Sequence, residues 1–117
     1  MRLNEVNYTD AQPVEGYGPG FFRIGGQVHY GAMICAPSGT RSWGGTEDAE
    51  ALLALADEID VLFFGTGGEI AHIPGDLRQK LEDAGIGVEV MNSPAACRTY
   101  NVLLSEGRRI ALAVLPV

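Results

Sequence analysis

Apolar positions change their spacing along the second half of the chain, and these changes mark alternating strands and helices. Residues 59–64 are almost all apolar, a run typical of a central parallel strand covered on both faces. Residues 86–91 and 109–115 are similar runs. Between these runs, apolar residues recur at helical spacing and predict helices over 74–84 and from 93 to about 106. This order predicts a layered α/β fold with a parallel β-α-β-α-β unit and right-handed crossovers.

The first half of the chain is typical of an antiparallel hairpin that follows an irregular arm. Two apolar-rich segments, 21–24 and 27–36, flank Gly25-Gly26, and glycine readily adopts the positive φ that both positions of a two-residue hairpin turn need. We expect this N-terminal hairpin to add antiparallel strands to one side of the parallel sheet. Residues 1–20 are expected to form the irregular arm. The whole chain is predicted to be a single α/β domain, because its length suffices for one core.

Capping residues predict where the helices begin and end. Thr46 is expected to cap a first helix that follows a loop over 41–45 and runs to about residue 58. Gly85 is expected to end the second helix, because glycine favours the left-handed backbone found there. Ser93 is expected to cap the third helix, with proline at the first helical position.

The charge of the chain excludes several classes of partner. Fifteen acidic residues against eight basic ones give a formal net charge of −7. Nucleic acids and anionic membrane surfaces attract clustered Lys and Arg, so neither is an expected partner. No apolar run approaches the roughly 20 residues needed to cross a bilayer, and no signal peptide or presequence is recognisable at the N-terminus. We therefore expect a cytoplasmic protein that is not an integral membrane protein.

Two loops are expected to meet beyond the carboxyl ends of the parallel strands, where open sheets tend to bind ligands. One loop holds the Gly65-Thr66-Gly67 turn, and the other holds Asn92-Ser93 at the start of the third helix. Free N–H groups at a helix start, together with the helix dipole, can hold an anion. The candidate ligand-binding residues of this crevice and the adjoining helix are Gly65, Thr66, Gly67, Asn92, Ser93, Arg98 and Asn101.

The same residues have a second interpretation that needs no ligand. The Gly65-Thr66-Gly67-Gly68 run lacks the Gly-Lys-Ser/Thr ending of a P-loop and the spacing of the dinucleotide fingerprint. Its glycines could serve only to turn the chain sharply, and Ser93 only to cap its own helix. The sequence leaves both interpretations open.

Cys97 is a possible reactive thiol. It lies early in the third helix beside Arg98, and a helix N-terminus and a cation can both lower the pKa of a thiol. A thiol nucleophile also needs a base, for which His29 and His72 are the candidates. The interpretation of Cys97 and the distant Cys35 as inert core thiols is favoured, because free cysteine is among the most buried residue types. The histidines and scattered acids form no recognisable metal set, so no metal and no cofactor are expected.

Three larger or polar side chains have two possible roles each. Trp43 lies in a glycine-rich loop and either folds back over the sheet or contributes to a partner surface. Asn101 has poor propensity for the middle of a helix, so we expect either a hydrogen-bonded clamp on the neighbouring loop or contact with a ligand. Tyr100 beside it is either a structural residue or a candidate interaction residue.

Two segments carry a resemblance to a known family. They are 60–67, which reads Asp-Val-Leu-Phe-Phe-Gly-Thr-Gly, and 91–116, within which Thr99-Tyr100-Asn101 is the most specific part. Together with Trp43 they resemble a small α/β domain family of largely unknown function. Its eukaryotic members include mitochondrial respiratory complex I assembly factor three and an adipogenesis-associated cytosolic protein. The resemblance implies a layered α/β domain with a β-hairpin, and it supplies no catalytic residue.

Three functional hypotheses follow. The leading one is a non-enzymatic interaction protein, an assembly factor for respiratory complex I or another membrane complex, whose partners would be subunits of that complex or other assembly factors. The second is a protein or enzyme that binds a small molecule or anion in the crevice between the Gly65 loop and the helix starting at Ser93. The third is a thiol enzyme that uses Cys97. The sequence does not determine the oligomeric state.

Overall fold

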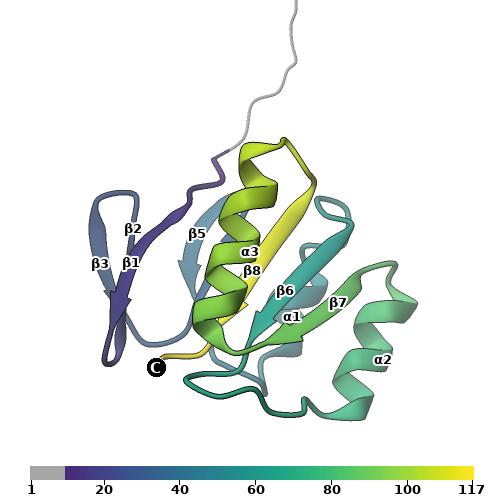
Figure 1. Ribbon diagram of the computed structural model, residues 1–117. Helices are drawn as coiled ribbons and strands as arrows, with labels where there is room; N and C mark the ends of the chain where they lie inside the picture. The colour runs from purple at the N-terminus through teal and green to yellow at the C-terminus, as the bar shows by residue number, and fades with distance from the viewer. Residues whose placement is uncertain (1–9) are drawn as a thin grey trace, which may run out of the picture.

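The computed structural model describes residues 10–117, which form two sheets and three helices arranged in layers (Figure 1). The larger sheet has the order β5-β4-β8-β6-β7, built from Gly39–Ser42, Met33–Ala36, Ile110–Val114, Val61–Gly65 and Gly87–Met91. The smaller sheet has the order β1-β2-β3, built from Val14–Gly18, Phe21–Ile24 and Gln27–Tyr30. The helices are α1 (Ala49–Leu53), α2 (Gly75–Asp83) and α3 (Ser93–Ser105).

The parallel β-α-β-α-β unit is confirmed. Strand β6 lies between β7 and β8 and is parallel to both, so that Gly65 at its end is in register with Met91 and with Val114. The chain leaves β6, forms α2 and returns as β7, then forms α3 and crosses to β8 on the other side of β6. The side chains of β6 enter two separate cores, as its nearly continuous apolar run predicts.

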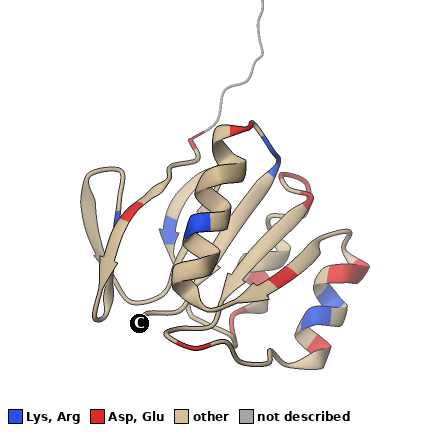
Figure 2. Cartoon of the chain, viewed as in Figure 1, with Lys and Arg blue, Asp and Glu red and all other residues tan. Residues whose placement is uncertain are grey.

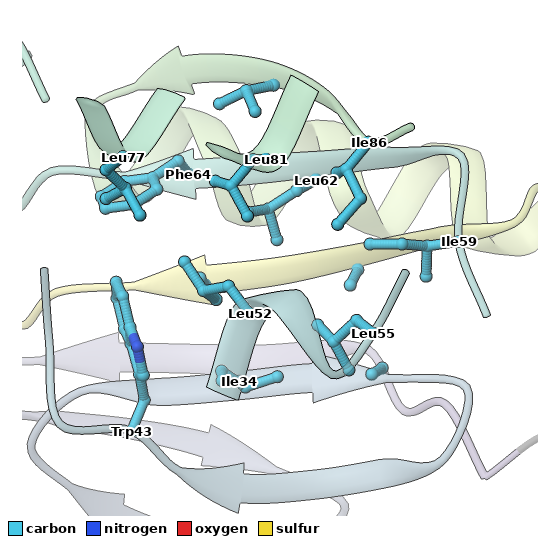
Figure 3. Close-up of a cluster of buried hydrophobic side chains, with 14 residues drawn as sticks. Ile34, Trp43, Leu52, Leu55, Ile59, Leu62, Phe64, Leu77, Leu81 and Ile86 are labelled. Atoms are coloured by element: carbon cyan, nitrogen blue, oxygen red, sulfur yellow. The ribbon is translucent and has the colours of Figure 1, made fainter. Parts of the chain in front are cut away.

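The large sheet separates two hydrophobic cores. On one face, α1 and α2 place Leu52, Leu77 and Leu81 against Leu62 and Phe64 of β6 (Figure 3). On the opposite face, α3 and the small sheet pack on the same strands, with these buried residues: Val14, Phe22, Ile24, Phe63, Ala96, Cys97, Tyr100, Leu112 and Val114. Helix α3 therefore packs on the large sheet along its inner side, with β1 of the small sheet beside it.

The expected long strand over 27–36 is wrong, and so is the expected position of its hairpin. Gly31 has φ +87° and breaks the segment into β3 and β4, which belong to different sheets. The Gly25-Gly26 turn does form a hairpin, with φ of +60° and +80°, but this hairpin joins β1 in the small sheet. The antiparallel pair that extends the parallel sheet is instead β4 with β5.

Several expected boundaries also differ from the structure. Within the expected irregular arm, Val14–Gly18 form β1 and residues 10–13 have no regular secondary structure. Residues 1–9 lie outside the described residues. The expected loop over 41–45 begins within β5. Asp48, not Thr46, caps α1 by accepting a hydrogen bond from the Ala51 N–H, and α1 is shorter than expected. Gly85 has φ +90° just after α2, as predicted.

Candidate functional site

The two loops expected to share an edge of the sheet do meet. Gly65 and Met91 are paired residues at the carboxyl ends of β6 and β7. The Thr66 N–H then donates to the Met91 carbonyl at 2.9 Å, and the Ser93 N–H donates to the Gly67 carbonyl at 2.7 Å. The crevice proposed from the sequence is therefore a junction between the β6–α2 loop and the start of α3.

Ser93 lies at the centre of this junction, with no exposed surface. Its hydroxyl donates to the Leu115 carbonyl at 2.6 Å and accepts a hydrogen bond from the Gly67 N–H at 2.9 Å. The expected role of Ser93 as N-cap is wrong, because Asn92 is the N-cap and its Oδ1 accepts from the Ala95 N–H at 2.8 Å. Ser93 instead connects three segments of the chain: the β6–α2 loop, α3 and the end of β8.

Gly65 makes that junction possible by its lack of a side chain. A Cβ at Gly65 would lie 2.7 Å from the Ser93 hydroxyl oxygen, 2.8 Å from the Ser93 Cα and 2.8 Å from a methyl carbon of Val114. Gly67 has φ +104°, a conformation that glycine adopts at little cost. These glycines allow close approach and a sharp turn, which the second interpretation of the motif predicts.

Thr66 stabilises its own loop. Its hydroxyl lies 2.8 Å from the Glu69 carbonyl and 3.2 Å from the Met91 carbonyl, so its single proton has two acceptors within reach. The hydroxyl oxygen also accepts a hydrogen bond from the Ala71 N–H at 3.0 Å. The hydrogen-bonding capacity of Thr66 is thus used inside the protein.

The start of α3 offers few free donors. The N–H groups of Ser93, Ala95 and Ala96 bond the Gly67 carbonyl, the Asn92 side chain and the Asn92 carbonyl, and Pro94 has no N–H. An anion at this helix start would have to displace one of these internal partners. Ligand binding by the crevice residues stays a prediction.

Asn101 and Tyr100 attach α3 to the N-terminal segment. Asn101 forms a two-point clamp on Val14 of β1, accepting from its N–H at 2.9 Å and donating to its carbonyl at 2.8 Å. Tyr100 is fully buried, and its hydroxyl donates to the Gln12 carbonyl at 2.9 Å. The clamp predicted for Asn101 is present, although it grips a strand rather than a loop.

Cys97 does not have the surroundings of a reactive thiol. Burial raises the pKa of Cys97 to about 12 and outweighs the opposing effect of Arg98, and burial likewise raises the pKa of Cys35 to about 12. Neither thiol forms a disulfide, and both lie in the core between α3 and the large sheet. His72 is an exposed residue of the β6–α2 loop, and His29 lies on β3 of the small sheet. Among residues 10–117, no three His, Cys, Asp or Glu side chains are grouped so that they could hold a metal ion.

Trp43 folds back onto the large sheet. Its ring packs edge-to-face on Phe64, with centroids 5.3 Å apart, and its Nε1–H donates to the Asp48 carbonyl at 3.1 Å. Only 6% of its surface is exposed. Of the two roles considered for Trp43, the packing role is confirmed.

Sequence reasoning missed a polar hollow of about 540 Å³ beside the small sheet. It is lined by residues from the segment before β1, from β2 and β3, and from β5, among them Asp10, Gln12, His29 and Thr40. No motif marks it, because its walls come from segments that are far apart in the sequence. Arg98, by contrast, is exposed on the outer side of α3, away from the crevice hydroxyls, and lines a separate shallow hollow.

Comparison with known proteins places the chain among relatives of both bacterial and animal origin. An uncharacterised protein of Rhodobacter capsulatus is 46% identical over the whole chain, which covers 94% of that protein. NADH dehydrogenase [ubiquinone] 1 alpha subcomplex assembly factor 3 of Danio rerio is 32% identical over 86% of the chain, and the match spans 62% of that longer protein.

Solved structures share the fold. A Bartonella henselae protein described as an outer membrane protein is 36% identical, with a TM-score of 0.84 and coverage of 93% of this chain and 98% of that one. A Mth938-like domain of Bordetella pertussis is 29% identical, with a TM-score of 0.76 and coverage of 99% of this chain and 92% of that one.

Within residues 10–117, none of the helices combines the length and the apolar character that crossing a bilayer requires. The profile of the DUF498/DUF598 proteins of unknown function matches residues 14–115, and the chain belongs to this family.

Proposed function

We propose that this chain is a non-enzymatic protein-binding factor that helps to assemble a membrane-bound respiratory complex, with complex I as the first candidate. The observation that carries the proposal is the similarity to assembly factor 3 over 86% of the chain. The match spans 62% of the animal protein, so the proposal concerns the shared domain. The partners would be subunits of the complex or other assembly factors.

The chemistry of the candidate site supports binding over catalysis. The Ser93 and Thr66 hydroxyls are occupied by internal partners. The raised pKa of Cys97 keeps its thiol protonated near neutral pH, and thiolates rather than thiols are the nucleophiles of cysteine enzymes. These side chains stabilise the fold, which leaves the outer surface of the domain for function.

Deletion of the gene in its own organism tests the proposal. We expect less assembled complex I on native gels and lower NADH:quinone oxidoreductase activity in membranes, both restored by a plasmid copy. Complex I subunits should also co-purify with the tagged chain from detergent-solubilised membranes. Unchanged complex I levels after deletion, together with no co-purifying subunit of any membrane complex, would refute the proposal.

Anion or small-molecule binding in the crevice is the alternative function. Its support is the position of the crevice at the carboxyl ends of β6 and β7, where ligands of open sheets tend to lie. A thermal-shift screen with phosphates, nucleotides and carboxylates tests it. A ligand that raises the melting temperature of wild type but not of Thr66→Ala would support a site there, whereas an equal shift in both would place the ligand elsewhere.

We also propose that the chain acts in a reducing compartment, the cytoplasm. Both cysteines are free thiols in the core, a state that reducing conditions preserve. Cell fractionation with an antibody against the chain tests this location, and recovery in the periplasmic fraction would exclude it.

A further inference from the structure

The outer side of α3 differs from the surface of an ordinary solvent-exposed helix. Five of the nine residues of α2 are charged, whereas Arg98 is the one charged residue among the 13 of α3 (Figure 2). A helix on the surface of a globular protein usually places charged and polar residues on the side away from the core. The outer side of α3 is therefore poor in charge for a surface in contact with water, and it exposes one large apolar residue, Val102.

A shallow hollow runs along this outer side. It measures about 280 Å³ and is lined by Arg98, Thr99, Val102 and Leu103. Arg98 and Val102 form one i, i+4 row, and Thr99 and Leu103 form the neighbouring row. The space between two such rows is the groove into which a second helix packs a row of its own side chains. Val102 has 57% of its surface exposed, so its burial by a partner helix would remove apolar surface from water.

Helix α3 is well anchored on its inner side. Ser93, Tyr100 and Asn101 bond the β6–α2 loop, the segment before β1, and β1 itself. The groove is thus formed in advance, and little conformational freedom would be lost when a partner binds.

Arg98 indicates the charge of that partner. It forms no ion pair with any residue in the described part of the chain, although the chain carries a net charge of −7. We propose that the groove of α3 binds an amphipathic helix of a partner protein, with an aliphatic side chain against Val102 and a carboxylate beside Arg98. This inference rests on the proposed protein-binding function and names the surface that performs it.

A second copy of the chain and a membrane surface fit the groove less well. In a two-fold dimer the same patch meets itself, and α3 has no acidic residue to receive the Arg98 of the other copy. A membrane-binding helix carries several Lys or Arg residues on its polar side, whereas α3 carries one cation.

Site-specific photo-crosslinking in cells tests the proposal. p-Benzoylphenylalanine is incorporated in place of Val102, and in a matched control in place of Ile70, an aliphatic residue that is 66% exposed on another surface. We expect an adduct from position 102 alone, mapped by mass spectrometry to a helical segment with an acidic residue within one turn of the cross-linked site. An adduct with a second copy, with lipid or with a non-helical segment, or equal labelling from both positions, would overturn the proposal.

Charge exchange with the purified partner provides the second measurement. Val102→Asp and Arg98→Glu should each weaken binding by about tenfold or more, while the surface controls Ile70→Asp and Lys80→Glu leave the affinity unchanged. Replacement of the partner's acidic residue by Arg should restore binding to Arg98→Glu. If complex I subunits bind the Val102→Asp and wild-type chains equally, the surface is wrong but the proposed function stands. If no subunit binds the wild-type chain, the proposed function itself fails.

Discussion

Replacement of Ser93 by Ala is the most direct test of whether the crevice residues are structural. The substitution removes one hydroxyl and leaves the Gly67 N–H and the Leu115 carbonyl without their partner. A buried polar group without a partner costs about 1–3 kcal/mol. The Gly67 group is buried, whereas the Leu115 carbonyl is partly accessible and can recruit water, so the total loss should be about 2–4 kcal/mol.

Urea unfolding of the purified chain measures this loss, and Ser105→Ala provides the matched control. Ser105 lies on the same helix and its hydroxyl also donates to a carbonyl, that of Val102, but at an exposed position. The control should change the free energy of unfolding by less than about 0.5 kcal/mol. If Ser93→Ala is no more destabilising than Ser105→Ala, the hydroxyl is not a structural junction, and a ligand role for Ser93 becomes the better explanation.

Three further predictions concern the Asn101 clamp, the close approach of Gly65 to Ser93, and the core thiols. Asn101→Ala should destabilise the fold by about 2–3 kcal/mol through the two lost bonds to Val14, and unchanged hydrogen exchange at the Val14 amide would contradict this. Gly65→Ala should cost at least about 1–3 kcal/mol by overpacking, while Gly68→Ala, where a Cβ would meet nothing within 4 Å, should be near neutral in the same urea assay. Burial raises the pKa of Cys35 and Cys97 to about 12. The unfolded chain therefore loses its thiol protons at a lower pH than the folded chain. Stability should fall as pH rises from about 9 towards 12, by up to roughly 1.4 kcal/mol per pH unit for each thiol. Urea unfolding at pH 8.5 and 10.5 measures this, and a slope that Cys97→Ala does not reduce would exclude that thiol as a source.

The parts of the fold that local patterns determine could be predicted from the sequence. The run over 59–64 is apolar apart from Asp60, and a run so short between turn signals favours a strand covered on both faces. Capping chemistry predicted that a helix starts near Ser93, and topology then brought that start to the edge where β6 ends. In each case the signal lies within a few consecutive residues.

The parts that depend on long-range contacts could not be predicted in this way. The segment over 27–36 is largely apolar and resembles one long strand, and only the backbone conformation of Gly31 shows that it serves two sheets. The role of Ser93 was also hidden, because a serine before proline is a good N-cap by local rules. Its actual partners, Gly67 and Leu115, are 26 and 22 residues away.

The inner and outer sides of α3 separate stability from recognition. Tyr100 and Asn101, which belong to the most specific part of the family motif, point inward and hold the N-terminal segment, so their preservation in a relative would by itself say nothing about a shared partner. Arg98 and Val102 contribute little to the internal packing, since both are exposed. Two family members can therefore keep the same fold while they bind different proteins. Relatives that bind the same partner helix should retain a cation at the position of Arg98 and an aliphatic residue at that of Val102, whereas relatives with other partners should vary there first.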